Sequence, residues 1–177
     1  MTTNVAGVTG WPDAIHAHFR RLAVRQVGYV PDSGHSRLID LCKNDPMIAD
    51  LVLTTEEEGI GLATGACLGG QRAALLMQSS GVGNCINMFS MLSNCRIPCL
   101  VLVTMRGEYG EFNPWQVAMG SITESSLRQC GFLTYRVERA EDVDDAVGSA
   151  ADMAFDGNFQ VAVLLSQRLI GRKQWSR

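Results

Sequence analysis

Short apolar runs alternate along this chain with longer segments in which apolar residues recur at helical spacing. A strand covered on both faces needs no polar alternation, so unbroken apolar runs between helices favour a parallel sheet with right-handed crossovers. We expect strands over residues 27–30, 51–54, 73–77, 99–104, 133–137 and 160–165. The pattern predicts an α/β fold with three layers, in which helices cover both faces of a mostly parallel, about six-stranded sheet.

Helix signals fill the segments between the strands. The first helix is expected from residue 11, where a proline stands near its start, to about residue 26. A capping box at residues 121–124 predicts the start of another helix, which Gly131 closes. We expect further helices around residues 38–42, from residue 56 through Gly69, over residues 84–92 and 140–155, and irregular chain over residues 105–120.

Length and composition are those of one globular domain. A chain of 177 residues is large enough for a substantial core, and 46% apolar with 19% charged residues is typical of a folded protein. We expect a single domain over residues 11–170, a frayed N-terminus over residues 1–10 and a basic tail over residues 171–177.

Charge and cysteine usage narrow the class of protein. A net charge of −3 provides no concentrated basic surface that would neutralise phosphates, so we expect no nucleic-acid partner. The six cysteines form no CxxC pair and several lie in apolar segments, which suits a reducing cytoplasm better than a disulfide framework. No leader pattern or membrane-spanning apolar run is present, so we expect a cytoplasmic protein without membrane attachment.

Four segments are expected to meet where the parallel strands end. Ligands of open α/β sheets bind beyond the carboxyl ends of the strands, which points to residues 31–35, 55–58, 79–84 and 105–120. Residues 80–84 lack the third glycine of a dinucleotide fingerprint, and no Walker phosphate loop is present. The sequence therefore predicts a pocket at this edge without naming its ligand.

The acidic and glycine-rich segment from residue 56 leaves alternatives open. Glu56, Glu57 and Glu58 stand at a helix start, where carboxylates stabilise the helix without any further role. Glycines at 61, 65 and 69 leave a helix face bare, at a cost of roughly 0.5–1 kcal/mol per glycine relative to alanine. Close packing on the sheet, a partner helix or a flat ligand ring would each account for that face.

Three sequence segments together resemble a known family. The segments EEEGIGLATG from residue 56, QSSGVGN from residue 78 and the dipeptide Arg106-Gly107 are similar to the pyrimidine-binding domain of thiamine diphosphate enzymes. Within that superfamily the chain most resembles sulfopyruvate decarboxylase alpha subunits and the N-terminal half of phosphonopyruvate decarboxylases. The similarity extends from about residue 30 to residue 170 and includes PWQVAMGSIT from residue 114.

The resemblance implies a role for Glu56. In this family a glutamate at the end of the second strand hydrogen-bonds the pyrimidine ring of the cofactor and stabilises the imino tautomer that deprotonates the thiazolium carbon. Counting back from Gly65, the glycine that closes the motif, gives the position of that glutamate as 56, with Glu57 as the main competitor.

The resemblance also implies a set of binding residues. Those expected at the cofactor are Glu56, Pro31, Ser79 and Gly81, and those expected at the substrate are Asp32, Ser33, His35, Ser80, Asn84, Arg106 and Gln116. Arg106 could pair with a sulfonate or phosphonate, but a salt bridge to Glu108 or Glu111 is an equal alternative. His35 could instead be a local hydrogen-bonding residue.

The other half of such an active site is missing from the sequence. Family enzymes hold the diphosphate through Mg²⁺ with a GDG motif followed by Asn, and this chain has neither, so we expect no metal ligands here. The resemblance implies a beta subunit with a PP domain that carries these ligands, in a homo- and hetero-oligomer. The glycine-rich helix and residues 84–92 are the segments expected at subunit interfaces.

These features lead to one expected function and two alternatives. The resemblance implies the pyrimidine-binding subunit of a thiamine diphosphate-dependent decarboxylase that converts sulfopyruvate, a small anionic 2-oxo acid, to sulfoacetaldehyde and CO₂. A phosphonopyruvate decarboxylase subunit is the first alternative. The second is a pyrimidine-domain homologue that oligomerises or regulates but performs no chemistry.

Overall fold

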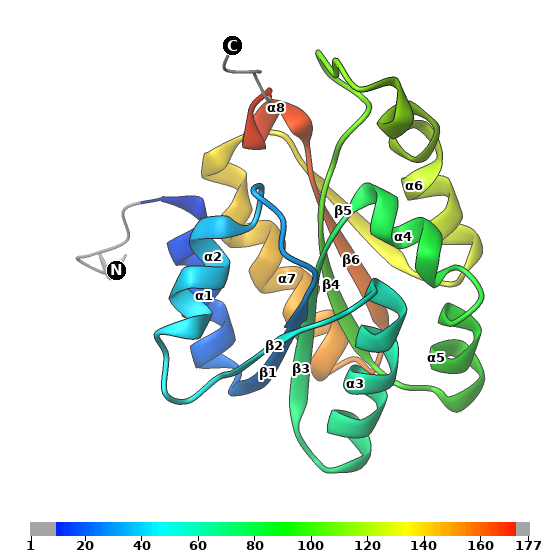
Figure 1. Cartoon of the computed structure of the whole chain (residues 1–177). Helices are drawn as coiled ribbons and strands as arrows, with labels where there is room; N and C mark the ends of the chain where they lie inside the picture. Colours follow the sequence, from blue (N-terminus) through cyan, green and yellow to red (C-terminus); the bar gives the residue numbers. More distant parts are fainter. Residues whose placement is uncertain (1–9, 173–177) are drawn as a thin grey trace.

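A six-stranded sheet with every strand parallel forms the middle layer of the protein, in a computed structural model that describes residues 10–172 (Figure 1). The strands are β1 (Val24–Tyr29), β2 (Ala49–Val52), β3 (Arg72–Gln78), β4 (Cys99–Thr104), β5 (Leu133–Val137) and β6 (Gln160–Leu165). Their order across the sheet is β2-β1-β3-β4-β6-β5. The predicted three-layer, parallel α/β fold is thereby confirmed.

Helices cover both faces of this sheet (Figure 1). One face carries α1 (Trp11–Arg21), α2 (Ser36–Lys43), α7 (Val143–Phe155) and the short α8 (Gln167–Ile170). The other carries α3 (Glu56–Leu68), α4 (Ser79–Cys85), α5 (Phe89–Cys95) and α6 (Val117–Gln129). Two single-turn 3₁₀ helices, η1 (Pro114–Gln116) and η2 (Ala140–Asp142), precede α6 and α7.

Alternate residues of the central strands enter two separate cores. In β4, Leu100 and Leu102 pack with α1 and α7, whereas Val101 and Val103 pack with α4 and α5. All six residues of β4 are buried, because this strand is covered on both faces. Double burial is the physical reason why the strands appear in the sequence as unbroken apolar runs.

The first helix is shorter than its apolar pattern predicts. It ends at Arg21, and Ala23 then takes a left-handed conformation with φ 52° before β1 begins at Val24. Val24 and Val27 continue the helical spacing of apolar residues although they belong to the strand, so the pattern alone extends the helix too far. The second strand likewise begins and ends two residues earlier than expected, at Ala49 and Val52.

The capping box predicted at residues 121–124 is wrong. Ser121 lies inside α6, and its hydroxyl donates back to the carbonyls of Val117 and Ala118. The cap is provided earlier by Asn113, whose side chain accepts a hydrogen bond from the backbone N–H of Trp115 in η1. The irregular segment after β4 therefore covers only residues 105–113 instead of reaching residue 120.

The stretch around residue 84 also differs from prediction. Residues 80–84, part of a segment expected at the pocket, are helical and belong to α4, and the expected helix over residues 84–92 is divided between α4 and α5. Gly81 and Gly83 allow α4 to lie close to other elements, and this close approach matters for the site below.

Further sequence predictions concern the chain ends, the cysteines and membrane attachment. Residues 1–9 and 173–177, which carry most of the predicted frayed N-terminus and basic tail, lie outside the described residues. All six cysteines lie within residues 10–172, and each is a free thiol. Within residues 10–172, none of the helices combines the length and the apolar character that crossing a membrane requires.

Candidate functional site

Four chain segments meet at the carboxyl edge of the sheet. They are the turn of residues 31–35 after β1, the start of α3 after β2, the start of α4 directly after β3, and residues 105–113 after β4. Because β1, β3 and β4 are adjacent in the sheet, hydrogen bonds link the segments that follow them. This is the edge at which parallel α/β sheets bind ligands.

Glu56 is the first residue of α3 and lies against α4. Its Oε2 accepts a hydrogen bond of 2.9 Å from the side-chain amide of Asn84. A Cβ atom on Gly81 would lie 2.5 Å from the Glu56 Cδ, so the carboxylate occupies space that any other residue would fill. Glu56 is half-buried, forms no ion pair within residues 10–172, and leaves Oε1 without a hydrogen bond from them.

The two neighbouring glutamates face elsewhere. Glu58 uses its Oε2 to accept a 2.8 Å hydrogen bond from the backbone N–H of Thr54, which satisfies an amide just before the helix. Glu57 is exposed and accepts no hydrogen bond from the part of the chain described here. Helix capping therefore accounts for Glu58, while the contact with Asn84 and Gly81 belongs to Glu56.

Asp32 joins the ends of three strands. Its Oδ2 accepts hydrogen bonds from the Thr104 hydroxyl at 2.7 Å and the Gly34 N–H at 3.1 Å. Its Oδ1 accepts one from the Gln78 side chain at 2.9 Å, and Gln78 in turn accepts one from the Ser80 hydroxyl at 3.1 Å. These bonds fix the turn after β1 to the ends of β3 and β4.

His35 lies underneath this turn and is only 1% exposed. Its Nε2 is 3.3 Å from the Met77 carbonyl and 3.2 Å from the Leu102 carbonyl, and since both are acceptors this nitrogen carries the proton. Burial lowers the pKa of His35, which keeps the ring neutral. Nδ1 is buried without a hydrogen-bond partner among residues 10–172. His35 thus donates hydrogen bonds to backbone carbonyls of β3 and β4, which are distant from it in sequence.

Arg106 forms a buried ion pair with Glu111. The bonds are 2.5 Å from Nε and 2.6 Å from Nη2, and the two side chains are 6% and 3% exposed. Of the two carboxylates considered from the sequence, Glu111 is therefore the partner. The bonds from Arg106 lower the pKa of Glu111 to about 2. Gln167 and the Asn113 N–H also donate to this carboxylate, at 2.9 and 3.0 Å.

Ser79 and Gln116 occupy the wall behind these groups. Ser79 is fully buried and its hydroxyl lies 3.1 Å from the Arg106 N–H, so it holds the start of the loop after β4. The Gln116 Oε1 atom is buried and accepts no hydrogen bond from residues 10–172. The backbone carbonyl oxygen of Gln116 would lie 2.1 Å from a Cβ atom on Gly107, and Gly107 has φ +82°. Gly107 therefore permits the approach of Gln116 to the sheet edge.

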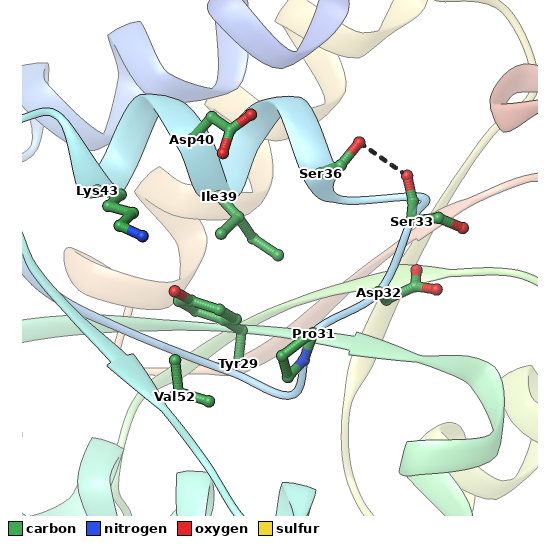
Figure 2. Close-up of a pocket in the computed structure, with 9 residues that line it drawn as sticks. All are labelled: Tyr29, Pro31, Asp32, Ser33, Ser36, Ile39, Asp40, Lys43 and Val52. Atoms are coloured by element: carbon green, nitrogen blue, oxygen red, sulfur yellow. Dashed lines mark hydrogen bonds between the residues drawn. The ribbon is translucent and has the colours of Figure 1, made fainter.

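A cavity of about 460 Å³ opens beside the turn after β1. Figure 2 shows its lining from the ends of β1 and β2 and from one side of α2: Tyr29, Pro31, Asp32, Ser33, Ser36, Ile39, Asp40, Lys43 and Val52. The Ser36 hydroxyl donates a 3.0 Å hydrogen bond to the Ser33 carbonyl, which closes the turn at the start of α2 (Figure 2). Three residues singled out in the sequence, Pro31, Asp32 and Ser33, thus share one cavity wall.

Sequence reasoning missed several residues of this edge. Gln78 and Thr104 hold Asp32, and Gln167 holds Glu111, yet none was selected. Gln78 opens the QSSGVGN segment and Thr104 ends an apolar strand, so both positions carried a usable signal. No local sequence pattern marks Gln167, because its contact with Glu111 depends on α8 folding back towards the loop after β4. Among the described residues, no group of three or more His, Cys, Asp or Glu is arranged to hold a metal ion.

Comparison with known proteins agrees with this geometry. The fold is similar to that of 2-oxoglutarate:ferredoxin oxidoreductase from Magnetococcus marinus, with a TM-score of 0.71 and 15% identity, over 92% of this chain and 29% of that one. The protein is therefore a three-layer α/β domain that shares the fold of this enzyme's matching region. It belongs to the family of sulfopyruvate decarboxylase alpha subunits.

The family assignment rests on relatives that this chain covers over most of their length. Sulfopyruvate decarboxylase subunit alpha of Methanococcus maripaludis is 31% identical over 86% of this chain and 92% of its own length. The subunit of Methanocaldococcus jannaschii is 34% identical over 76% of this chain and 80% of its own length. Phosphonopyruvate decarboxylase of Streptomyces viridochromogenes is 38% identical over 71% of this chain, but only 30% of that longer protein is covered. None of the protein-family models compared with the chain matches it.

Proposed function

We propose that this chain is the pyrimidine-binding subunit of a thiamine diphosphate-dependent decarboxylase that converts sulfopyruvate to sulfoacetaldehyde and CO₂. The observation that carries the proposal is the Glu56 carboxylate, which lies on Gly81 at the sheet edge, is oriented by Asn84 and is not neutralised by an ion pair within residues 10–172. A carboxylate in that state is suited to accept a hydrogen bond from a heterocycle.

The residues at this edge fit the pyrimidine side of the cofactor. Glu56 Oε1 is the acceptor for a ring nitrogen, while the amide of Asn84 holds Oε2 and so fixes the direction of Oε1. The absence of a side chain on Gly81 keeps the carboxylate in place, and Ser79 secures the adjoining loop from a buried position. When bound, thiamine diphosphate supplies the electron sink that decarboxylation of a 2-oxo acid requires.

The substrate side of the site is formed by the neighbouring turn and loop. Asp32 and Ser33 lie on the cavity wall, and Gln116 offers a buried carbonyl oxygen that accepts no hydrogen bond from residues 10–172. A buried polar atom is costly without a partner, so Gln116 is suited to receive a donor from a ligand or partner chain. His35 acts from beneath as a neutral hydrogen-bonding support of the turn.

The active enzyme requires a second kind of subunit. The relatives that cover 76% or more of this chain are named as alpha subunits. A beta subunit with a PP domain, its GDG motif and its Asn supplies the diphosphate and Mg²⁺ ligands in this proposal. Free thiols at all six cysteines suit a reducing compartment, which supports a cytoplasmic location for the assembled enzyme in this proposal.

The test combines the purified chain with a PP-domain subunit, thiamine diphosphate and Mg²⁺, and measures CO₂ release. Sulfopyruvate should give turnover, and omission of either chain should abolish it. A phosphonate needs nearly the same donors as a sulfonate, so phosphonopyruvate is the comparison substrate. A higher kcat/KM with phosphonopyruvate would favour a phosphonopyruvate decarboxylase subunit instead. Absence of turnover with every 2-oxo acid, despite formation of the complex, would favour the non-catalytic module.

A further inference from the structure

A second, smaller cavity lies at the same edge of the sheet. Its volume is about 80 Å³, and it is enclosed by residues 32–34, by Arg106 and by residues 170–172 at the end of α8. The described residues that line it include two arginines, Arg106 and Arg172. We refer to it as the arginine cavity.

We propose that the arginine cavity binds the sulfonate group of the substrate and that Arg172 is a specificity-determining residue. This inference rests on the proposed function, and it adds a subsite and a residue near the C-terminal end of the described chain.

Arg106 retains unused donors although it is paired with Glu111. A guanidinium has five N–H groups, and the ion pair uses one on Nε and one on Nη2. Nη1 donates no hydrogen bond to any residue in the range 10–172, and the side chain is only 6% exposed. The Glu111 pair fixes the plane of the guanidinium, so the remaining donors are pre-oriented for an anionic group in the cavity they line.

Arg172 provides the second positive charge. Its aliphatic chain packs on Gly110, which has φ +59° and no side chain to block the approach. Within the described part of the chain Arg172 forms no ion pair and donates no hydrogen bond. The hydroxyl of Ser33 adds a neutral donor, since it too makes no side-chain hydrogen bond with residues 10–172.

Among the described residues, Asp32 is the one carboxylate on the wall of the arginine cavity, and it would oppose an anion. Its two oxygens accept bonds from Thr104, Gly34 and Gln78, so three donors compensate its charge inside the protein. The donors left for a ligand are therefore guanidinium and hydroxyl groups. A volume of about 80 Å³ is several times the roughly 10–15 Å³ of cavity that one water molecule needs, so it has room for one compact group with several oxygens.

The start of α4 connects the arginine cavity with Glu56. Gly81 contacts the Glu56 carboxylate, Ser80 bonds to the Gln78 that holds Asp32, and Ser79 bonds to the backbone of Arg106. These three residues are consecutive, and one helical turn rises only about 5.4 Å. A short 2-oxo acid can therefore place its sulfonate in the cavity while its reacting carbon stays near the cofactor side.

The experiment measures binding of 3-sulfopropionate, which carries the sulfonate but has no keto group to react. Isothermal titration calorimetry is performed with the assembled enzyme and with the chain alone, and propionate is the comparison. We expect 3-sulfopropionate to bind at least about tenfold more tightly than propionate, and Arg172→Gln to remove about tenfold of that affinity. Arg168→Gln is the matched control, since this nearby guanidinium lies over the Tyr109 ring at 4.6 Å, outside the cavity lining, and should leave affinity unchanged.

The outcomes separate this inference from the proposed function. Unchanged 3-sulfopropionate affinity in Arg172→Gln, equal affinity for propionate, or no binding by either wild-type form would overturn the sulfonate subsite even if the enzyme turns over sulfopyruvate. Binding that depends on Arg172, in an assembly that decarboxylates no 2-oxo acid, would support the subsite and reject the proposed function. Lower kcat/KM for sulfopyruvate in Arg172→Gln, with kcat preserved, is the kinetic result expected when both hold.

Discussion

At the scale of single residues, the contact between Glu56 and Gly81 distinguishes three otherwise equivalent carboxylates. The sequence places all three at a helix start, and only the folded chain shows that Glu58 caps the helix while Glu56 faces α4. The carboxylate that the family motif indicates is thus also the one that the geometry selects for the proposed role. A glutamate at the first helical position is stabilised by the helix dipole and still keeps one oxygen available.

The Gly81 contact gives a direct prediction. Gly81→Ala adds a methyl group 2.5 Å from the Glu56 Cδ and Oε1 atoms, so the carboxylate must move. We expect kcat of the assembled enzyme to fall by about 100-fold, the loss typical of a misplaced catalytic group. Steady-state CO₂ release measures this change. Gly83→Ala is the control, because the atoms nearest to its methyl group belong to the flexible Met119 side chain. Unaffected activity in Gly81→Ala would contradict the account.

Part of the site was predictable residue by residue and part was not. The motif located Glu56, Gly81 and Asn84, which the structure brings into contact. The choice of Glu111 over Glu108 as partner of Arg106 was left open, because it depends on how residues 107–113 fold back. In the structure Glu108 is paired with Arg136 of β5, a contact that no local pattern signals.

At the scale of elements, the loop after β4 is held by a buried charge cluster. Glu111 accepts bonds from Arg106, Gln167 and Asn113, and Gln167 also accepts bonds from the N–H groups of Glu108 and Tyr109. The loop is therefore an ordered connection between β4, η1 and α8. Such loops carry function because a rigid sheet positions them.

This cluster predicts a pH dependence of stability. The Glu111 pKa lies near 2 in the folded protein against 4.5 ordinarily, so the ionised form stabilises the fold above pH 4.5. That contribution, about 3 kcal/mol, should be lost as the pH falls from about 4.5 towards 2. The free energy of unfolding in urea, measured from pH 7 to pH 2.5, tests this.

Glu111→Gln provides the matching variant. It leaves the buried Arg106 guanidinium without its counter-charge, so we expect a loss of about 3 kcal/mol at pH 7. The difference from wild type should shrink as wild-type Glu111 becomes protonated. A difference that stays constant down to pH 2.5 would contradict the assigned ion pair.

Element boundaries were harder to predict than element types. Strands β4 and β6 have the bounds expected from their apolar runs, because burial on both faces leaves no ambiguity. The bounds of the more exposed edge strand β5 are also as expected. The start of α6 was misplaced because Ser121 and Glu124 have capping-box spacing inside a helix that Asn113 and Pro114 had already started. Side-chain bonds from Ser121 to its own helix can be identified only once the helix is known.

At the scale of the whole molecule, the glycine-rich helix α3 has two different faces. Gly59 packs on the sheet, where an added Cβ would lie 3.0 Å from Leu53 and Leu75. Gly61 and Gly65 are exposed, and an added Cβ would meet no atom within 4 Å. Close packing on the sheet thus explains Gly59, whereas the sheet does not explain Gly61 and Gly65.

The two faces predict opposite effects of the same substitution. In the isolated chain, Gly61→Ala should raise the free energy of unfolding by about 0.5–1 kcal/mol, since alanine is the better helix former and space is open. Gly59→Ala should lower it by about 1 kcal/mol, because two leucines must shift. Urea denaturation of both variants checks the signs, and stabilisation by Gly59→Ala would contradict the packing described.

Assembly can be tested on the same helix. The sequence predicts that α3 packs at a subunit interface, so Gly61→Leu should weaken association with the beta subunit without unfolding the isolated chain. Sedimentation velocity with an equimolar PP-domain subunit measures this, with Gly61→Ala as the smaller control. Full assembly of Gly61→Leu would exclude this face from the interface.

The fold as a whole was the most predictable level. Unbroken apolar runs and intervening helices indicated a three-layer parallel sheet, and the motif pair indicated its type. The strand order β2-β1-β3-β4-β6-β5 could not be derived in the same way, because it is set by which helices pack on which face. The arginine cavity was equally hidden, since it joins residues 32–34 to residues 170–172 across the length of the chain.

The central claim is that Glu56 is the catalytic carboxylate of a shared active site. The most direct measurement is CO₂ release from sulfopyruvate by the assembled enzyme carrying Glu56→Gln, with Glu57→Gln as the matched neighbour. We expect Glu56→Gln to lower kcat by about 100-fold or more with normal folding and assembly, and Glu57→Gln to retain activity within about twofold. Equal activity of Glu56→Gln and wild type, or loss confined to Glu57→Gln, would contradict the account.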